Sequence, residues 1–443
     1  MCSRYTSYSR TLMDHSKERE VRKSLTALGL ILTFAAVSRA DWPEFRGPTG
    51  QGTTTESRLP LTWSDQENVA WRVPVEGVAW SSPSIVGGKI FLTTAVETGD
   101  EKKLWKLKAL CFDEKTGKEL WSKELFEHDG EVQFHAKNSH ASPTALVADG
   151  VVYVHFGPHG TAALTTAGEV LWKTNELEYG PQHGNGGSPA LAGDLLVICC
   201  DGRDVQYVVG LERKTGKIRW KTPRDTKPSK GFSFSTPLIL TINGRSEAVC
   251  PGSDAVFAYD PATGKEIWRV RYADGYSVVP RPIYAGGLVF VCTGYNKPKL
   301  LAIDPTGEGD VTETHLKWTV EKGVPHNPSI VAVDSELYCV SDAGIAVCVD
   351  QASGKIHWQQ RLGGNYSASP LAANGYVYFQ DEAGKGIVLK AGTTFEKVAE
   401  NEFVKGERTF ASYGVDDGAL FIRSEHHLFR VQEGAKLQAA ATP

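Results

Sequence analysis

The chain has 443 residues, with 48 lysines and arginines against 52 aspartates and glutamates, and its formal net charge is −4. A charge this close to balance, carried by scattered basic residues, argues against a nucleic-acid partner. Length alone would suggest about three domains of roughly 150 residues each. An internal repeat runs through nearly the whole chain, however, and it replaces that estimate.

Residues 1–40 have the pattern of an export signal. Two basic residues precede an apolar run at 25–37, and Ser38-Arg39-Ala40 offers small residues where a signal peptidase cuts. The run is short for a bilayer-spanning helix, so we favour a cleaved signal over a membrane anchor. Met13 would give a signal of more ordinary length and is a candidate for the true start. We therefore expect a periplasmic or secreted protein that is not an integral membrane protein.

The remainder of the chain divides into three predicted parts. Residues 41–64 are rich in glycine and proline and lack periodicity, which indicates a loop strapped onto the domain. A propeller over 65–432 follows, and we expect a disordered tail at 433–443.

One sequence unit recurs along the chain. In residues 257–268 it reads Phe-Ala-Tyr-Asp-Pro-Ala-Thr-Gly-Lys-Glu-Ile-Trp, which predicts a strand, a turn and a second strand. Aspartate and glycine suit a tight hairpin with a bulge, and tryptophan suits a gap between packed sheets. Complete copies begin at Asp113, Glu212 and Asp350, a degenerate copy begins at Thr165, and a copy with an insertion begins at Asp304.

A second marker alternates with the first. It is typically a small residue followed by proline and an apolar run, and its steps are mostly roughly 42 to 48 residues. Periods of that length that contain only strand signals favour a propeller over helical repeats. The marker residues are Ser82, Ser142, Ser188, Thr236, Arg281, Asn327 and Ser369, with Ser412 in the eighth position.

The two ends of the repeat complete each other. Residues 67–75 match the tryptophan end of a blade, and residues 412–432 match the beginning of one. The strand around Trp71 should therefore supply the outer strand of the last blade and remove the open sheet edges. We predict an all-β fold, an eight-bladed β-propeller of four-stranded antiparallel blades that this N-terminal strand closes.

Seven cysteines follow the predicted signal, most of them at strand positions. Such thiols usually behave as small buried hydrophobes, and a core of this size needs no disulfides. Bridges between Cys199 and Cys200 or between Cys339 and Cys348 are the less favoured alternatives.

The Asp-x-x-Thr-Gly-Lys-x-x-Trp signature resembles that of the pyrroloquinoline-quinone (PQQ)-like propeller superfamily. That superfamily includes quinoprotein alcohol dehydrogenases and the non-catalytic outer-membrane assembly factor BamB. Within it the chain is most similar to exported bacterial proteins of unassigned activity, over about residues 41–432. The motifs that carry this likeness lie at 42–48, 183–189, 200–204 and 363–370. The enzymes of the superfamily hold PQQ and a divalent cation over the central channel, but this sequence lacks their Cys-x-x-Cys-His haem motif and a recognisable Glu, Asn and Asp metal set.

Candidate ligand-binding residues lie in the loops that should surround one mouth of the channel. A circle of aromatic, imidazole, amide and guanidinium side chains with few carboxylates can recognise an anionic or planar ligand. The alternative is that these groups solvate a water-filled funnel and bond one another. The candidates are Trp80, His140, His183, Asn185, Tyr276, Arg281, His326, Asn365, Tyr366 and Arg408, with Asp201, Arg203 and Asp204 from a neighbouring loop.

These observations favour a non-catalytic binding or scaffold module. We expect a monomer that engages a protein or a cell-envelope component at the funnel mouth, and we assign no catalytic residue and no metal ligand. The alternative is a PQQ-dependent alcohol or sugar dehydrogenase with calcium as a possible cation. There His183, Asn185, Arg281 and Asn365 would hold the quinone, and Asp201 or Asp204 would accept the proton. A polysaccharide-acting enzyme would need paired carboxylates, which these loops do not supply.

Overall fold

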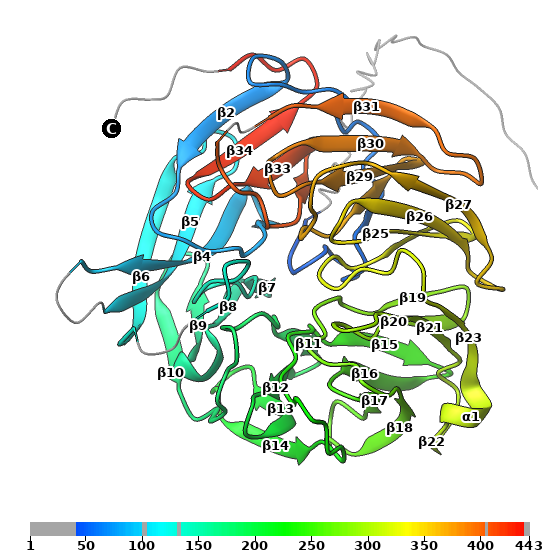
Figure 1. Cartoon of the computed structure of the whole chain (residues 1–443). Coiled ribbons are helices and arrows are strands. Elements are labelled where there is room, and N and C mark those ends of the chain that lie inside the picture. Colours follow the sequence, from blue (N-terminus) through cyan, green and yellow to red (C-terminus); the bar gives the residue numbers. More distant parts are fainter. Residues whose placement is uncertain (1–40, 100–103, 131–133, 404–405, 438–443) are drawn as a thin grey trace, which may run out of the picture. The chain divides into compact units, whose positions relative to one another are not determined.

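The computed structural model describes residues 41–99, 104–130, 134–403 and 406–437. The predicted export signal at 1–40 lies outside the described residues, and so does the predicted tail beyond Leu437. Of the tail's first residues, Gly434 donates its backbone N–H to Asn68 Oδ1 at 2.8 Å. The described strands form eight sheets arranged around a central axis (Figure 1), so the predicted eight-bladed all-β propeller is confirmed.

Each blade has four antiparallel strands; in all blades but the last they follow chain order, and the first strand lies innermost (Figure 1). Blades 1 and 2 contain β3 (Ser84–Val86), β4 (Lys89–Glu97), β5 (Trp105–Asp113) and β6 (Glu119–His128), then β7 (Leu146–Ala148), β8 (Val151–His155), β9 (Thr161–Thr165) and β10 (Val170–Thr174). Blades 3 and 4 contain β11 (Ala190–Ala192), β12 (Leu195–Asp201), β13 (Gln206–Glu212) and β14 (Ile218–Pro223), then β15 (Leu238–Ile242), β16 (Arg245–Pro251), β17 (Ala255–Tyr259) and β18 (Glu266–Arg271).

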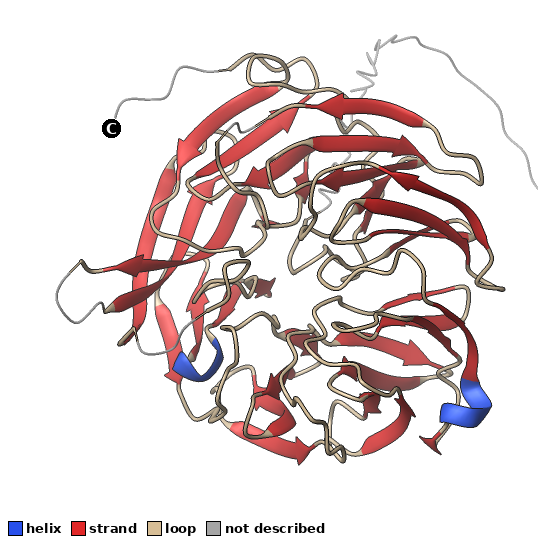
Figure 2. Cartoon of the chain, in the orientation of Figure 1, coloured by secondary structure: helices blue, strands red, loops and turns tan. Residues whose placement is uncertain are grey.

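The second half of the ring repeats this order. Blades 5 and 6 contain β19 (Ile283–Ala285), β20 (Leu288–Cys292), β21 (Leu300–Ile303) and β23 (Leu316–Val320), then β24 (Val331–Val333), β25 (Glu336–Val340), β26 (Ile345–Asp350) and β27 (Ile356–Arg361). Blade 7 contains β28 (Leu371–Ala373), β29 (Tyr376–Gln380), β30 (Gly386–Lys390) and β31 (Lys397–Asn401). The described helices are the single turns η1 (Gly157–His159) and α1 (Thr312–His315), drawn blue in Figure 2.

The last blade joins the two ends of the chain. Its inner strands are β32 (Gly414–Asp416), β33 (Ala419–Arg423) and β34 (His427–Gln432), and its outer strand is β2 (Val69–Pro74). β2 runs antiparallel to β34, with Trp71 opposite Arg430. The predicted closure of the ring by the strand around Trp71 is therefore confirmed.

The repeated hairpin has the predicted turn chemistry. Asp260 Oδ1 accepts the Ala262 N–H at 2.8 Å, and the Asp260 carbonyl accepts the Gly264 N–H at 2.8 Å. Gly264 has a φ of +71°, which a residue with a Cβ rarely adopts. The strand register shifts between Ala258 and Tyr259, as the expected bulge requires.

The tryptophan of one blade docks on the hairpin glycine of the next blade. Trp220 Nε1 donates to the Pro261 carbonyl at 2.9 Å, and a Cβ on Gly264 would stand 2.4 Å from the Trp220 ring. This contact explains why the repeat carries both residue types. It recurs at Trp71 with Gly117, Trp121 with Gly168, Trp172 with Gly216 and Trp318 with Gly354.

This docking predicts unequal effects for two alanine substitutions at glycines of similar backbone conformation. Gly216 (φ +71°) and Gly150 (φ +76°) both need the left-handed region, but only Gly216 faces a neighbour, the Trp172 ring at 2.5 Å. Gly150→Ala should cost about 1–2 kcal/mol of unfolding free energy through backbone strain alone. Gly216→Ala should cost about 1–3 kcal/mol more because it overpacks the blade interface. Equal urea midpoints for the two variants would contradict the docking role.

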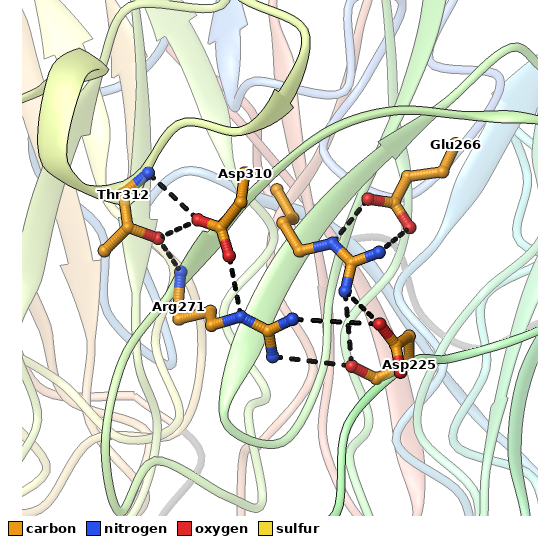
Figure 3. Close-up of polar contacts among 6 residues, drawn as sticks. Asp225, Glu266, Arg271, Asp310 and Thr312 are labelled. Carbon is orange, nitrogen blue, oxygen red and sulfur yellow. Dashed lines mark hydrogen bonds and ion pairs between the residues drawn. The ribbon is translucent and has the colours of Figure 1, made fainter.

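Blades 4 and 5 depart from the repeat at the insertion after Gly307. The insertion places β22 (Gly309–Asp310) parallel to β18, and Trp268 Nε1 donates to Glu247 Oε2 instead of a hairpin carbonyl. Figure 3 shows the polar contacts that hold this edge: Arg271 Nε donates to Asp310 at 2.8 Å, and its backbone N–H donates to Thr312. The insertion therefore extends the outer edge of blade 4.

Blade 7 has no tryptophan in its own hairpin, which suggests a weak contact with blade 8. Trp63 from the N-terminal segment takes that place. It is 3% exposed, stacks on Tyr378 of blade 7, and belongs to the same apolar cluster as Phe403 and Phe421 of blades 7 and 8. The aromatic side chain beside blade 7 is thus supplied by a residue that lies far away in the sequence.

Residues 41–54 cross the centre of the ring, where Figure 1 shows the dark blue segment. Trp42 forms an antiparallel bridge with Ile85 of blade 1, and β1 (Thr53–Thr54) pairs in parallel with β28 of blade 7. On other sides the Pro43 carbonyl accepts the Val147 N–H, and Gln51 Oε1 accepts the Tyr284 N–H. The segment is therefore bonded to the innermost strands of blades 1, 2, 5 and 7, and we call it the plug.

All seven described cysteines are buried and unpaired, as expected for small apolar core residues. Neither the Cys199–Cys200 nor the Cys339–Cys348 bridge is present. Among the described residues, no helix is long and apolar enough to cross a membrane.

Candidate functional site

A ring of side-chain hydroxyls links the innermost strands. In seven places a backbone N–H in one blade donates to a serine or threonine hydroxyl of the next blade at 2.9–3.0 Å. In blades 2 and 6 the hydroxyl follows the marker proline instead of preceding it. Arg281 occupies the blade 5 position. The accepting residues are Thr144, Ser188, Thr236, Ser329, Ser369, Ser412 and Ser82, and this set is the hydroxyl ring.

A cavity of about 650 Å³ opens above the hydroxyl ring. Phe45 of the plug lies on its lining together with six ring residues, all but Thr236. The remaining lining comes from loops that lead into the first strands and from loops between the second and third strands, which meet at the same end of the channel. We call this cavity the funnel, and the plug contacts the strands below it.

The hydroxyl ring supplies hydrogen-bond donors to the funnel floor. Each ring oxygen already accepts a backbone N–H, as in the bond from Ser412 N to Ser82 Oγ. In the described part of the chain these lining hydroxyls have no acceptor for their own protons, which are thus available to a ligand. A floor of this kind favours an acceptor-rich or anionic ligand.

One wall of the funnel is a continuous aromatic arc. Ring centroids lie 5.3 Å apart for His183 and Phe232, 5.7 Å for Phe232 and Tyr276, and 5.7 Å for Tyr276 and Tyr295. His326 extends the arc at 5.1 Å from Tyr295. Such a surface can stack against planar groups.

Trp80 and Phe410 form another part of the wall, with ring centroids 4.5 Å apart. The Arg408 guanidinium lies over both rings, at 5.3 Å and 5.7 Å from their centroids, and pairs with Glu425. Arg408 therefore supports this wall from the rim and is not on the funnel lining.

The funnel carries more cationic than anionic groups. Lys230 is exposed, donates to the Tyr276 hydroxyl at 3.1 Å and lies over the Tyr276 ring. Both contacts are with a neutral side chain. Lys137 pairs with Glu382 at 2.7 Å. Burial lowers the pKa of His183, and nearby His135 and Lys230 lower it further. At neutral pH the lysines therefore supply the positive charge, and His183 adds charge only in acid.

Among the described residues that line the funnel, Asp342 is the one carboxylate. Burial would raise its pKa, but hydrogen bonds from the His326 side chain and backbone lower the pKa overall. Asn327 Nδ2 also donates to Asp342 at 2.5 Å. This carboxylate is thus ionised and already bonded to neighbouring groups.

Four predicted ligand-binding residues lie on the funnel lining: Trp80, His183, Tyr276 and His326. Arg203 and Asp204 line a smaller neighbouring cavity of about 310 Å³, which shares Lys230 and Phe232 with the funnel. Asp204 Oδ1 there accepts the Gly180 and Val205 N–H groups, so it also holds its own turn. Asn365 is exposed and is outside the described lining.

Five predicted residues are buried away from the funnel lining. Asp201 forms a bidentate ion pair with Arg224, and both side chains are 0% exposed. The remaining buried candidates are His140, Asn185, Arg281 and Tyr366.

Arg281 is an anchor for the plug. It donates to the Phe45 carbonyl at 2.6 Å and the Pro237 carbonyl at 3.1 Å, and it pairs with Glu44 at 3.2 Å. Asn185 Nδ2 similarly donates to the Phe156 carbonyl at 3.0 Å, inside blade 2. Both residues lie in loops that lead into first strands, and their side chains point into the protein because buried carbonyls there need hydrogen-bond donors.

Sequence reasoning missed several lining residues. Tyr295 and Asp342 follow second strands, and antiparallel alternation alone places those loops at the same mouth. Lys230, His135 and Lys137 lie in the loops already considered but farther from the marker prolines. The positive charge of the two lysines was the available signal.

The funnel does not fit the quinone and divalent cation that enzymes of this fold hold. A hard cation such as Ca²⁺ takes six to eight oxygen ligands, usually with carboxylates among them. The described lining offers only the Asp342 carboxylate, and His326 and Asn327 already occupy it. Of the two candidate proton acceptors, Asp201 is sealed in an ion pair and Asp204 holds its own turn. We therefore derive no quinone chemistry from these residues.

Comparison with known families agrees with this architecture. A family model, PQQ_2, described as outer membrane protein assembly factor BamB, matches residues 65–245, 206–328 and 315–396. The chain belongs to this family. No curated protein sequence matches the chain.

Solved structures show the same fold at low sequence identity. BamB from Moraxella catarrhalis has a TM-score of 0.57 and 14% identity, over 82% of this chain and 99% of that one. Quinohemoprotein alcohol dehydrogenase from Comamonas testosteroni has a TM-score of 0.44 and 14% identity, over 91% of this chain and 82% of that one. A europium-containing methanol dehydrogenase has a TM-score of 0.43 and 12% identity, over 79% of this chain and 89% of that one. The similarity to the first shows the fold, and the two lower TM-scores carry no argument about activity.

Proposed function

We propose that the protein is a non-catalytic binding module whose funnel takes an acidic, aromatic-bearing segment of a protein partner. The observation that carries this proposal is the donor-rich floor, where each lining hydroxyl of the ring already accepts a backbone N–H and keeps its own proton for a ligand, below an aromatic arc and Lys230. Carboxylates of the segment would meet hydroxyl protons and ammonium groups, and its rings would stack on the arc. Membership of the BamB family supports a binding role.

The location follows from the same proposal. The BamB description points to the cell envelope, and the export pattern at residues 1–40 agrees with it. Export with cleavage near Ala40 is tested by N-terminal sequencing of the protein from cell fractions. A mature protein that begins well before Asp41 would contradict cleavage.

Binding should depend on the charge of Lys230. A fluorescent peptide of alternating glutamate and phenylalanine is the probe, and fluorescence anisotropy measures its affinity. Lys230→Glu should weaken binding about tenfold or more, because it replaces attraction by repulsion at the funnel wall. Lys217→Glu is the matched control, since Lys217 is an exposed lysine in the hairpin at the opposite end of blade 3.

Two outcomes would contradict the proposed function. Equal effects of Lys230→Glu and Lys217→Glu would show that only overall charge matters. Saturable binding of PQQ with calcium, together with dye reduction in the presence of alcohols, would instead make the protein a quinoprotein dehydrogenase.

Peptide binding should strengthen in mild acid. The pKa of His183 lies below its ordinary value of about 6.5, so this imidazole becomes charged only as the pH falls below that value. The peptide's glutamates stay ionised above about pH 4.3. Affinity should therefore rise several-fold between about pH 7.5 and pH 5.5, and His183→Gln should reduce that rise. A pH-independent affinity in the native protein would contradict the role of His183.

A further inference from the structure

Three histidines converge between blades 1 and 2, outside the funnel lining. His128 ends β6, His140 lies in the loop that leads into blade 2, and His159 ends η1. One ligand nitrogen from each lies within 4.8 Å of the other two. No carboxylate belongs to this group, which we call the histidine cluster.

Each member has a buried nitrogen with no hydrogen-bond partner among the described residues. These atoms are His128 Nε2, His140 Nδ1 and His159 Nε2. Buried polar atoms in folded proteins are nearly always partnered, and a solitary exception usually marks an unseen water or ion. Three such atoms in one place point to a partner that all three share.

The protonation of the histidine cluster suits a cation. The Asp129 carbonyl accepts a hydrogen bond from His128 Nδ1 at 2.5 Å, so Nδ1 carries the proton and Nε2 presents its lone pair. Neutral imidazoles at pH 7 are the form that binds metals.

We propose that His128, His140 and His159 form a binding site for a divalent transition-metal ion of the zinc class. Imidazole nitrogens select Zn²⁺, Cu²⁺, Ni²⁺ and similar ions over Ca²⁺ and Mg²⁺, which prefer oxygen. Three histidines leave a fourth tetrahedral position for water or another ligand. The ion would join the outer strand of blade 1 to blade 2.

The cluster must tighten when it binds the ion. Nitrogens bound to Zn²⁺ at about 2.0–2.1 Å in a tetrahedral site lie about 3.3 Å apart. The rings of His128 and His159 are stacked, with centroids 3.9 Å apart and planes 11° apart, so one ring must turn until both planes meet at the ion. His159 is half-buried on a single helical turn and is the ring with room to move. Trp105 and Phe134 pack against His140 at 4.7 Å and 4.6 Å and hold it in place.

The test uses untagged protein freed of metal by a chelator. Zn²⁺ binding is followed by calorimetry and Co²⁺ binding by visible absorption. We expect one equivalent of each ion, a four-coordinate Co²⁺ spectrum with nitrogen ligands, and no heat with Ca²⁺. His159→Gln should weaken Zn²⁺ binding by at least about 100-fold. His315→Gln, at a half-buried histidine on α1 outside the cluster, should leave it unchanged.

His140→Asn provides a second variant with the same expected loss. If that buried substitution unfolds the protein by circular dichroism, the half-buried His159 variant decides the result. Absence of Zn²⁺ and Co²⁺ binding at millimolar concentrations would overturn the proposal. Native-like affinity in His159→Gln, or equally tight Ca²⁺ binding, would overturn it as well.

Discussion

Asp201→Ala should lower the free energy of unfolding by about 3–5 kcal/mol, because removal of one partner strands a buried charge. Arg224 donates to Asp201 Oδ1 at 2.7 Å and to Oδ2 at 2.8 Å, and both side chains are 0% exposed. Arg224 also donates to the Cys250 and Pro251 carbonyls, so the pair ties blade 3 to blade 4. Burial acts to lower the pKa of Arg224, but attraction to Asp201 outweighs it and raises the pKa well above its ordinary value.

Urea unfolding followed by tryptophan fluorescence measures this loss. Asp194→Ala is the control, since Asp194 is 83% exposed and lies 3.7 Å from Arg213, and such pairs contribute about 0–1 kcal/mol. The double variant Asp201→Leu, Arg224→Met should recover most of the stability, because apolar residues can replace a buried pair at little cost. An Asp201→Ala variant as stable as Asp194→Ala would refute a structural role for the pair.

Trp71→Ala should destabilise the ring by about 3–5 kcal/mol, the usual cost of deleting a buried tryptophan side chain. Trp71 is 3% exposed, donates to the Glu114 carbonyl at 3.1 Å and packs against Phe421 at 6.1 Å. It connects the closing strand β2 to both blade 8 and blade 1. Loosening of β2 would also expose the edge of β34, so we expect the variant to aggregate on heating.

Trp358→Ala is the matched control for ring closure. Trp358 donates to the Gly392 carbonyl at 3.1 Å, the same kind of bond, but it is half-buried and lies in a blade that is continuous in the chain. Hydrogen exchange of β34 amides should accelerate in Trp71→Ala and not in Trp358→Ala. Equal stability and equal exchange in the two variants would show that closure does not depend on Trp71.

The candidate site was predicted only in part, and particular residues show why. Trp80 and Tyr276 face the funnel as expected. Arg281, from an equivalent loop, turns inward because the Phe45 and Pro237 carbonyls lie within its reach. Phe45 is remote from Arg281 in the sequence, so no local pattern around Arg281 could reveal this partner. His140 joins His128 and His159 for the same reason, since these residues come from three different elements.

The sequence by itself determined the blade, its repetition and the closure of the ring. Those features depend on short-range chemistry: aspartate and glycine in a hairpin, alternation along a strand, and a tryptophan at a constant spacing. Only the tertiary structure decided that the plug crosses the channel, that Trp63 fills the gap beside blade 7, and which loop side chains face the funnel. Those outcomes depend on contacts between distant segments, where a side chain goes to whichever buried donor, acceptor or apolar gap the folded ring leaves open.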